Sequence, residues 1–153
     1  MKNYYTIKEI EERTGISAHT LRYYDKEGLL KFVKRSQSGM RMFSEDDFEP
    51  LYTISVLKRS GMAIKEIREF MDLYLEGNSS IEKRRVLFEK HRQKLQERID
   101  ELNEMMEIVD YKCWYFAEAE KHNDINYYLN QPQDEVDPRI IAFNQKVKDF
   151  RNQ

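Results

Sequence analysis

Hydrophobic and polar positions in the first 75 residues alternate at helical spacing and are punctuated by glycine. In TIKE, residues 6–9, Thr6 and Glu9 form a capping box that predicts a helix start. A second helix is expected from Ser17 to about residue 27, and Gly28 ends it. Neither helix is long enough to be stable alone, so the two must pack together. A helix, a glycine turn and a second helix predict a helix-turn-helix.

The next segment predicts a hairpin and two further helices. KFVKR and MRMF flank SQSG, which is typical of a small hairpin. A helix is expected from Ser44 to about Ser60, and Gly61 separates it from a shorter one with Ile67 and Phe70 on its apolar face. Residues 1–75 therefore predict a compact helical domain with one hairpin wing.

A long helix is expected over residues 79–121, where no glycine or proline interrupts the chain. Its apolar residues recur in steps of seven, four and three, which is a heptad pattern. About 35 residues of helix span about 50 Å, more than a small domain can cover. Dimerisation is therefore favoured over packing on its own domain. The residues expected at this dimer seam are Phe88, Leu95, Ile99, Leu102, Met106, Val109, Cys113 and Phe116.

Residues 122–153 form a tail in which the heptads end. Asp137 and Pro138 predict the start of a short amphipathic helix. Ile140, Phe143 and Phe150 lie on its apolar face, but the pattern does not indicate where that face docks.

Composition agrees with this mainly α-helical plan. The chain is 35% charged and 40% hydrophobic, with 5 Gly and 3 Pro. We find no signal peptide and no apolar run long enough to cross a bilayer. The single cysteine, Cys113, excludes an intrachain disulfide framework. We therefore expect a cytoplasmic protein.

Charge is distributed unevenly along the chain. The net charge is −2, yet residues 13–41 hold seven basic side chains and two acidic ones, Asp25 and Glu27. Such a cluster indicates a polyanionic partner for this segment, while the more acidic remainder of the chain would repel it.

The second helix has the side chains for DNA recognition. Leu21 and Tyr24 are three apart and can face the core, which leaves Arg22 and Tyr23 on other faces. Arginine can bind a phosphate or a guanine edge, and a tyrosine hydroxyl suits a phosphate oxygen. The alternative is an ordinary solvated helix surface. Local charge and the following wing favour DNA binding.

The stretches TLRYYDKEGLL, FSEDD and LKRSGMAIKEI, in this order and spacing, resemble the MerR family of transcriptional regulators. The resemblance implies a homodimer of winged helix-turn-helix domains joined by an antiparallel coiled coil. It also implies binding to a pseudo-palindromic promoter, whose spacer is bent and untwisted for RNA polymerase. The DNA-binding residues it implies, together with the helix cap, are Ser17, His19, Thr20, Arg22, Tyr23, Tyr24, Arg35, Arg41, Phe43 and Lys65.

The wing departs from the family pattern at two positions. The family often has a tyrosine where this chain has Phe43, so a phosphate bond is lost there and packing remains. Phe32 replaces a usual proline. Arg41 is retained, and the wing is still expected to meet DNA.

The single cysteine limits the signals that this chain can sense. One cysteine cannot build a two-thiolate metal site within a subunit, so no metal or cofactor is expected. LKRSGM and YKCWYF resemble a branch linked to aldehyde and electrophile stress, but its usual cysteine position is Val56 here. Cys113 is then either inert core or a redox sensor, and its seam position favours inert core.

An aromatic group near the end of the long helix is a candidate effector pocket. The alternative, which we favour, is that these rings cap the coiled coil. The residues are Tyr111, Trp114, Tyr115, Tyr127 and Tyr128.

Two other classes of protein are alternatives to a promoter-activating regulator. An enzyme is disfavoured because the chain has no phosphate loop, no HExxH and no nucleophile elbow. An architectural or adaptor protein of the MerR type, without promoter activation, remains the alternative.

Overall fold

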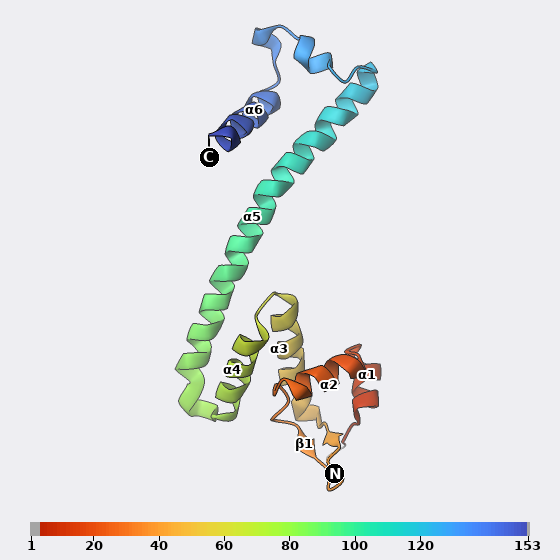
Figure 1. Cartoon of the computed structure of the whole chain (residues 1–153), viewed down its shortest axis with the longest axis vertical. Coiled ribbons are helices and arrows are strands. Elements are labelled where there is room, and N and C mark those ends of the chain that lie inside the picture. The colour runs from red at the N-terminus through yellow and green to blue at the C-terminus, as the bar shows by residue number, and fades with distance from the viewer. Residues whose placement is uncertain (1–3, 153) are drawn as a thin grey trace. The chain divides into compact units, whose positions relative to one another are not determined.

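The computed structural model of the chain describes residues 4–152 and is mainly helical, as expected (Figure 1). It divides into two compact units, one extending to Leu95 and the other beginning at Gln96. Within the described residues, no helix is both long and apolar enough to cross a membrane.

The helix-turn-helix forms where its caps predict it. Helix α1 spans Ile7–Thr14, and the backbone N–H of Thr6 donates to the Glu9 carboxylate at 2.7 Å. Gly15 has φ of 72°, a left-handed conformation that most side chains disfavour. Helix α2 spans Ala18–Lys26, and the Ser17 hydroxyl accepts the backbone N–H of Thr20 at 3.0 Å. Local sequence therefore sets both helix starts.

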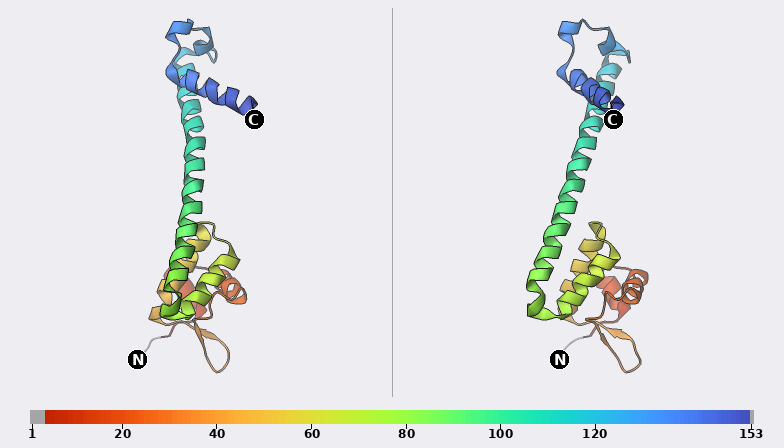
Figure 2. Two further views of the ribbon diagram at one scale, coloured as in Figure 1. Left: turned by 90° about the vertical axis from the view of Figure 1, so that its left-hand side faces the viewer. Right: turned by 60° about the vertical axis from the view of Figure 1, so that its left-hand side comes forward.

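The wing is a hairpin of two very short strands. Strand β1, Lys34–Arg35, pairs antiparallel with β2, Arg41–Met42, and Arg35 lies directly opposite Arg41. An isolated bridge between Tyr5 and Phe43 extends this pairing to the start of the chain. The hairpin projects from the helices of the first unit (Figure 2).

Helices α3, Phe48–Arg59, and α4, Ile64–Leu75, complete the core of the first unit. Each fully buried aliphatic side chain contributes about 2 kcal/mol of hydrophobic stabilisation. The hydrophobic side chains that are 0–1% exposed come from α1 to α4 and from the segments between them: Ile10, Leu21, Leu29, Leu30, Phe43, Leu51, Ile54, Ile67 and Met71.

The long helix α5 spans Ile81–His122. A 3-10 turn, Gly77–Ser80, leads into it, and Ser80 is fully buried there. The Ser80 hydroxyl donates to the carbonyls of Leu73 and Gly77, which ties the end of α4 to the start of α5.

In the second unit, helix α6, Pro138–Arg151, packs on α5. Ile140 is 5% exposed, and the Phe143 ring stacks on Tyr111 with centroids 4.3 Å apart. Lys146 bonds the Glu107 carboxylate at 2.6 Å. The tail helix predicted from Asp137 therefore forms, and its docking face, which the sequence left open, is the Tyr111 side of α5. Two 3-10 helices, Tyr127–Asn130 and Gln133–Glu135, connect α5 to α6.

Candidate nucleic-acid interface

Helix α2 presents a polar outer face over an apolar inner one. Leu21 is 0% exposed and Tyr24 5%, whereas His19, Arg22 and Tyr23 are exposed. Burial raises the pKa of Tyr24 above its ordinary value, with a smaller contribution from Tyr23. The Tyr24 ring therefore belongs to the core, and the contact of its hydroxyl with a phosphate stays a prediction.

Ser17 and Thr20 serve the start of α2. Both are half-buried, and their hydroxyls lie 2.9 Å apart in a hydrogen bond. This hydrogen bond and the cap bond from the Thr20 N–H fix the N-terminal end of α2, the helix that carries His19 and Arg22.

Two wing arginines converge on one carboxylate of α2. Arg35 donates to an Asp25 oxygen at 3.0 Å, and Arg41 donates to the other Asp25 oxygen. Arg41 also donates to the carbonyl of Val33 at 2.7 Å, and Arg35 to that of Gly39 at 2.8 Å. The Arg35 side chain is 50% exposed, but that of Arg41 is 12% exposed. The expected role of Arg41 as an open DNA contact is therefore not supported by its position.

Phe43 is a further correction. Its side chain is 0% exposed, and its backbone bonds Tyr5 in both directions, at 2.7 and 2.9 Å. A ring buried in the core cannot reach DNA. Phe43 instead attaches the base of the wing to the core.

Helix α4 adds a basic residue and a link to α2. Lys65, near its N-terminus, is exposed. Arg68 donates to the backbone carbonyl of Glu27 at 2.6 Å and to its carboxylate at 2.9 Å. Asp25, Glu27 and Arg68 connect the elements that display the candidate DNA contacts. Sequence reasoning missed these three roles, and the two acidic residues within the basic segment were the signal that could have revealed the first two.

The seam side of α5 is exposed in the single chain. The exposed fractions are 43% for Ile99, 55% for Leu102, 56% for Met106, 53% for Val109 and 52% for Phe116. Cys113 is also exposed. An apolar row at heptad spacing is the surface that a second helix would bury.

The N-terminal end of this row behaves differently. The Phe88 ring packs edge-on against Phe70 of α4, with centroids 5.0 Å apart, and remains 39% exposed. Leu95 is half-buried. Phe88 therefore serves its own domain at least in part, which corrects its assignment as a pure dimer residue.

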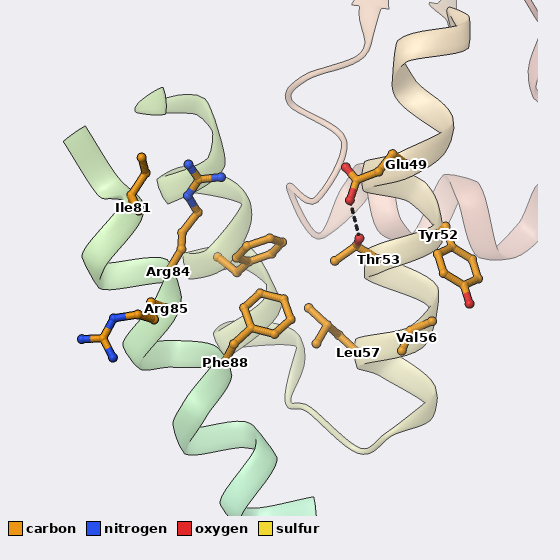
Figure 3. A pocket seen from close by; sticks show the side chains of 10 residues that line it. Glu49, Tyr52, Thr53, Val56, Leu57, Ile81, Arg84, Arg85 and Phe88 are labelled. Carbon is orange, nitrogen blue, oxygen red and sulfur yellow. Dashed lines mark hydrogen bonds between the residues drawn. The ribbon is translucent and has the colours of Figure 1, made fainter. Parts of the chain in front are cut away.

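A hollow of about 700 Å³ lies beside Phe88 (Figure 3). Leu57 and Val56 of α3 line it together with Phe88, and Figure 3 shows the Leu57 and Phe88 side chains facing each other. Its apolar lining includes the position where the electrophile-sensing branch has its cysteine. Valine at this position gives the hollow no thiol.

The aromatic residues lie on the other side of α5 from the seam. At 3.6 residues per turn, the five positions between Met106 and Tyr111 place their side chains about 140° apart around α5. Tyr111 and Trp114 line a groove of about 420 Å³ between α5 and α6, together with Phe143 and Arg139. The Arg139 guanidinium lies 4.5 Å from the Trp114 ring centroid.

The three other predicted rings do not line this groove. Tyr115 and Tyr128 pack behind it, with centroids 6.2 Å apart, and Trp114 contacts Tyr128 at 5.1 Å. Tyr127 stacks on His122 at 3.6 Å. The five aromatic residues therefore lie close together, but only Tyr111 and Trp114 line the groove, and the other three pack near it.

Among residues 4–152, no group of three or more His, Cys, Asp or Glu side chains is placed to hold a metal ion.

A helix-turn-helix with a basic outer face, a wing and a long following helix defines a winged DNA-binding regulator. The family description "MerR HTH family regulatory protein" matches residues 5–73, and "MerR, DNA binding" matches residues 49–110. An HTH-type transcriptional regulator of Haemophilus influenzae is 36% identical over 129 residues, covering 84% of this chain and 95% of the relative. This chain belongs to the MerR family of transcriptional regulators.

Solved structures agree with this assignment. HiNmlR, a MerR family regulator lacking the sensor domain and bound to promoter DNA, has a TM-score of 0.70 at 35% identity, covering 81% of this chain and 98% of HiNmlR. A MerR family regulator from Bacillus thuringiensis has a TM-score of 0.65 at 32% identity, covering 72% of this chain and 97% of the other.

Proposed function

We propose that this MerR regulator binds a pseudo-palindromic promoter site as a homodimer and changes transcription by bending and untwisting the spacer. The observation on which this rests is the exposed group His19, Arg22 and Tyr23 on α2, next to a wing attached to the same helix. Two such groups in one dimer would hold a DNA segment at two points, which suits work by deformation. HiNmlR, similar over most of this chain, was crystallised on promoter DNA.

We assign three regions to this function. Residues 1–75 are the DNA-binding domain, with Arg35 and Lys65 as backbone contacts. Residues 79–121 form the dimerisation helix, paired antiparallel with its copy, and residues 122–153 form the tail. RNA polymerase would respond through the distorted DNA, in the bacterial cytoplasm.

Footprinting and transcription together test the proposal. The dimer should protect a site within an overlong promoter spacer. Shortening that spacer by one or two base pairs should raise basal transcription and abolish the dependence on the protein. Protection of clustered sites at recombination ends, with no effect of spacer length, would instead support the architectural alternative.

We further propose the α5–α6 groove as the place where a small apolar effector binds. Its walls are Tyr111, Trp114 and Phe143, and Arg139 lies at Trp114. Because the groove faces away from the seam, a ligand there would not compete with dimerisation.

The groove can be tested with 1-anilinonaphthalene-8-sulfonate, an aromatic anion that accepts energy from tryptophan. Trp114 is the single tryptophan of the chain, so energy transfer reports on this site. Ala142→Arg, which fills the groove, should abolish transfer, while Asn144→Arg on the same helix should not. Equal transfer in both variants would place the probe elsewhere.

A further inference from the structure

The two wing arginines form a pair that should be unfavourable by itself. Arg35 and Arg41 are directly opposite each other in the β1–β2 register. Like charges at directly opposite positions of an antiparallel pair destabilise it. The Asp25 carboxylate bonds both guanidinium groups, one on each oxygen, and so turns this repulsion into an attraction. We call Asp25, Arg35 and Arg41 the wing triad.

The wing has few other means of holding its place. Each strand is two residues long, and an isolated hairpin is at best marginally stable. The Tyr5–Phe43 bridge anchors its base. The triad joins its strands to the last turn of α2, one turn beyond Arg22.

The two arginines are used differently. Arg41 is enclosed, since it bonds Asp25 and the Val33 carbonyl and is 12% exposed. Arg35 bonds Asp25 and Gly39 yet stays 50% exposed, so it can meet a phosphate without leaving the triad. Lysine could not replace Arg41, because a single ammonium lacks the rigid fork that reaches two acceptors.

We infer that Asp25 is a positioning residue for DNA binding: through Arg41 and Arg35 it fixes the wing beside α2. This inference rests on the proposed DNA-binding function. The inference predicts that removing the Asp25 charge weakens DNA binding, which is the opposite of what charge repulsion alone predicts. A carboxylate near phosphates repels DNA, so removing its charge should by that argument strengthen binding.

Binding of the full-length protein to a duplex selected by the wild type from a random-sequence library tests the inference. Asp25→Asn should weaken binding about tenfold, the loss expected for charge-assisted hydrogen bonds. Asp25→Glu, which keeps the charge, should restore most of the affinity. Glu12→Gln, the same charge change on the exposed side of α1, is the matched control and should leave affinity unchanged.

Arg41→Lys separates positioning from direct contact. If Arg41 positions the wing, Lys weakens binding about as much as Asp25→Asn does, and the double variant is no worse than either single one. If Arg41 contacted a phosphate directly, lysine would largely preserve affinity, and that result would overturn its place in the inference.

Hydrogen exchange of the wing amides, measured without DNA, tests whether Asp25 holds the wing and does not depend on the proposed function. Wing amides of residues 34–42 should exchange roughly tenfold faster in Asp25→Asn, with α1 and α4 unchanged. Unchanged wing exchange, or tighter DNA binding by Asp25→Asn, would refute it. Failure of the wild type to select any duplex would reject the proposed function, while the exchange result would still decide whether Asp25 holds the wing.

Discussion

At the scale of single residues, neighbours in the sequence have different roles. Arg22 and Tyr23 are exposed, whereas the adjacent Tyr24 is in the core and Asp25 holds the wing. Four consecutive positions thus divide between proposed DNA contact, packing and positioning. Helical spacing explains the first division, because consecutive side chains point about 100° apart.

Arg22 is the residue that we expect to contribute most to base recognition. Arg22→Ala should weaken operator binding by roughly 1–3 kcal/mol and flatten the preference for sequence. Arg151→Ala, on an exposed position of α6, is a control with the same change of charge. Titration of both variants against specific and random duplexes measures the effect. Unchanged affinity for both duplexes would remove Arg22 from the recognition surface.

Sequence predicted the outward residues of α2 well but missed the wing triad. Caps and glycines set α1 and α2 locally, so Ser17 and Gly15 were sufficient to place them. The triad instead depends on which part of α2 the hairpin reaches, and this is set by tertiary packing and not by local sequence. The full burial of Phe43 has a similar reason, since its bridge to Tyr5 joins residues far apart in the chain.

At the scale of elements, polar bonds as well as apolar contacts connect the helices of the first unit. Glu66 of α4 accepts from Lys94 of α5 at 2.8 Å, about one and a half helical turns beyond the Phe70–Phe88 contact. The hydrogen bond from Lys94, and then the backbone N–H of Ala63, lower the pKa of Glu66 below its ordinary value of 4.5. This contact should therefore make the α4–α5 junction sensitive to acid.

The sign of that sensitivity follows from the lowered pKa. Glu66 binds a proton more readily in the unfolded chain, so its contribution to stability is present above about pH 4.5 and is lost as the pH falls through the folded pKa. Glu66→Gln should lower stability at pH 7 by less than about 1 kcal/mol, because the pair is near the surface. It should also reduce the difference in stability between pH 7 and pH 3.

Urea unfolding of both proteins at several pH values measures this effect. Glu69→Gln on the same helix, an exposed residue, provides the control. An unchanged pH dependence in Glu66→Gln would show that the Lys94 contact does not contribute in solution.

Helix α6 of the tail shows what the hydrophobic periodicity can predict about a whole helix and what it cannot. The pattern predicted a helix with Ile140, Phe143 and Phe150 on one face. In the structure Ile140 is buried and Phe143 stacks on Tyr111, yet Phe150 is 76% exposed. An apolar face indicates that a helix docks, but its partner's length and direction decide how much of that face is covered.

At the scale of the whole molecule, the proposed dimer is the next level of structure. Leu102 is on the exposed row of α5 with Ile99 and Met106. Leu102→Asp should convert the dimer to a monomer, because a charge at the centre of an apolar helix pair would be buried without a partner. It should also lower operator affinity by much more than tenfold, since the two half-sites would no longer be bound jointly.

Sedimentation velocity and operator titration measure both effects. Asn103→Asp adds the same charge about 100° away from Leu102 on α5 and should leave the dimer intact. A wild-type chain that sediments as a monomer, or a Leu102→Asp chain that still pairs, would contradict the proposed seam.

Helix α5 uses its two sides for different contacts. The tail helix covers the side with Tyr111 and Trp114, and the heptad row occupies the opposite side. A substitution on one side leaves the other chemically unchanged, so selection can act on each separately. Descendants of this chain can therefore exchange or redesign the tail, and with it any signal received there, while they keep the proposed dimer seam.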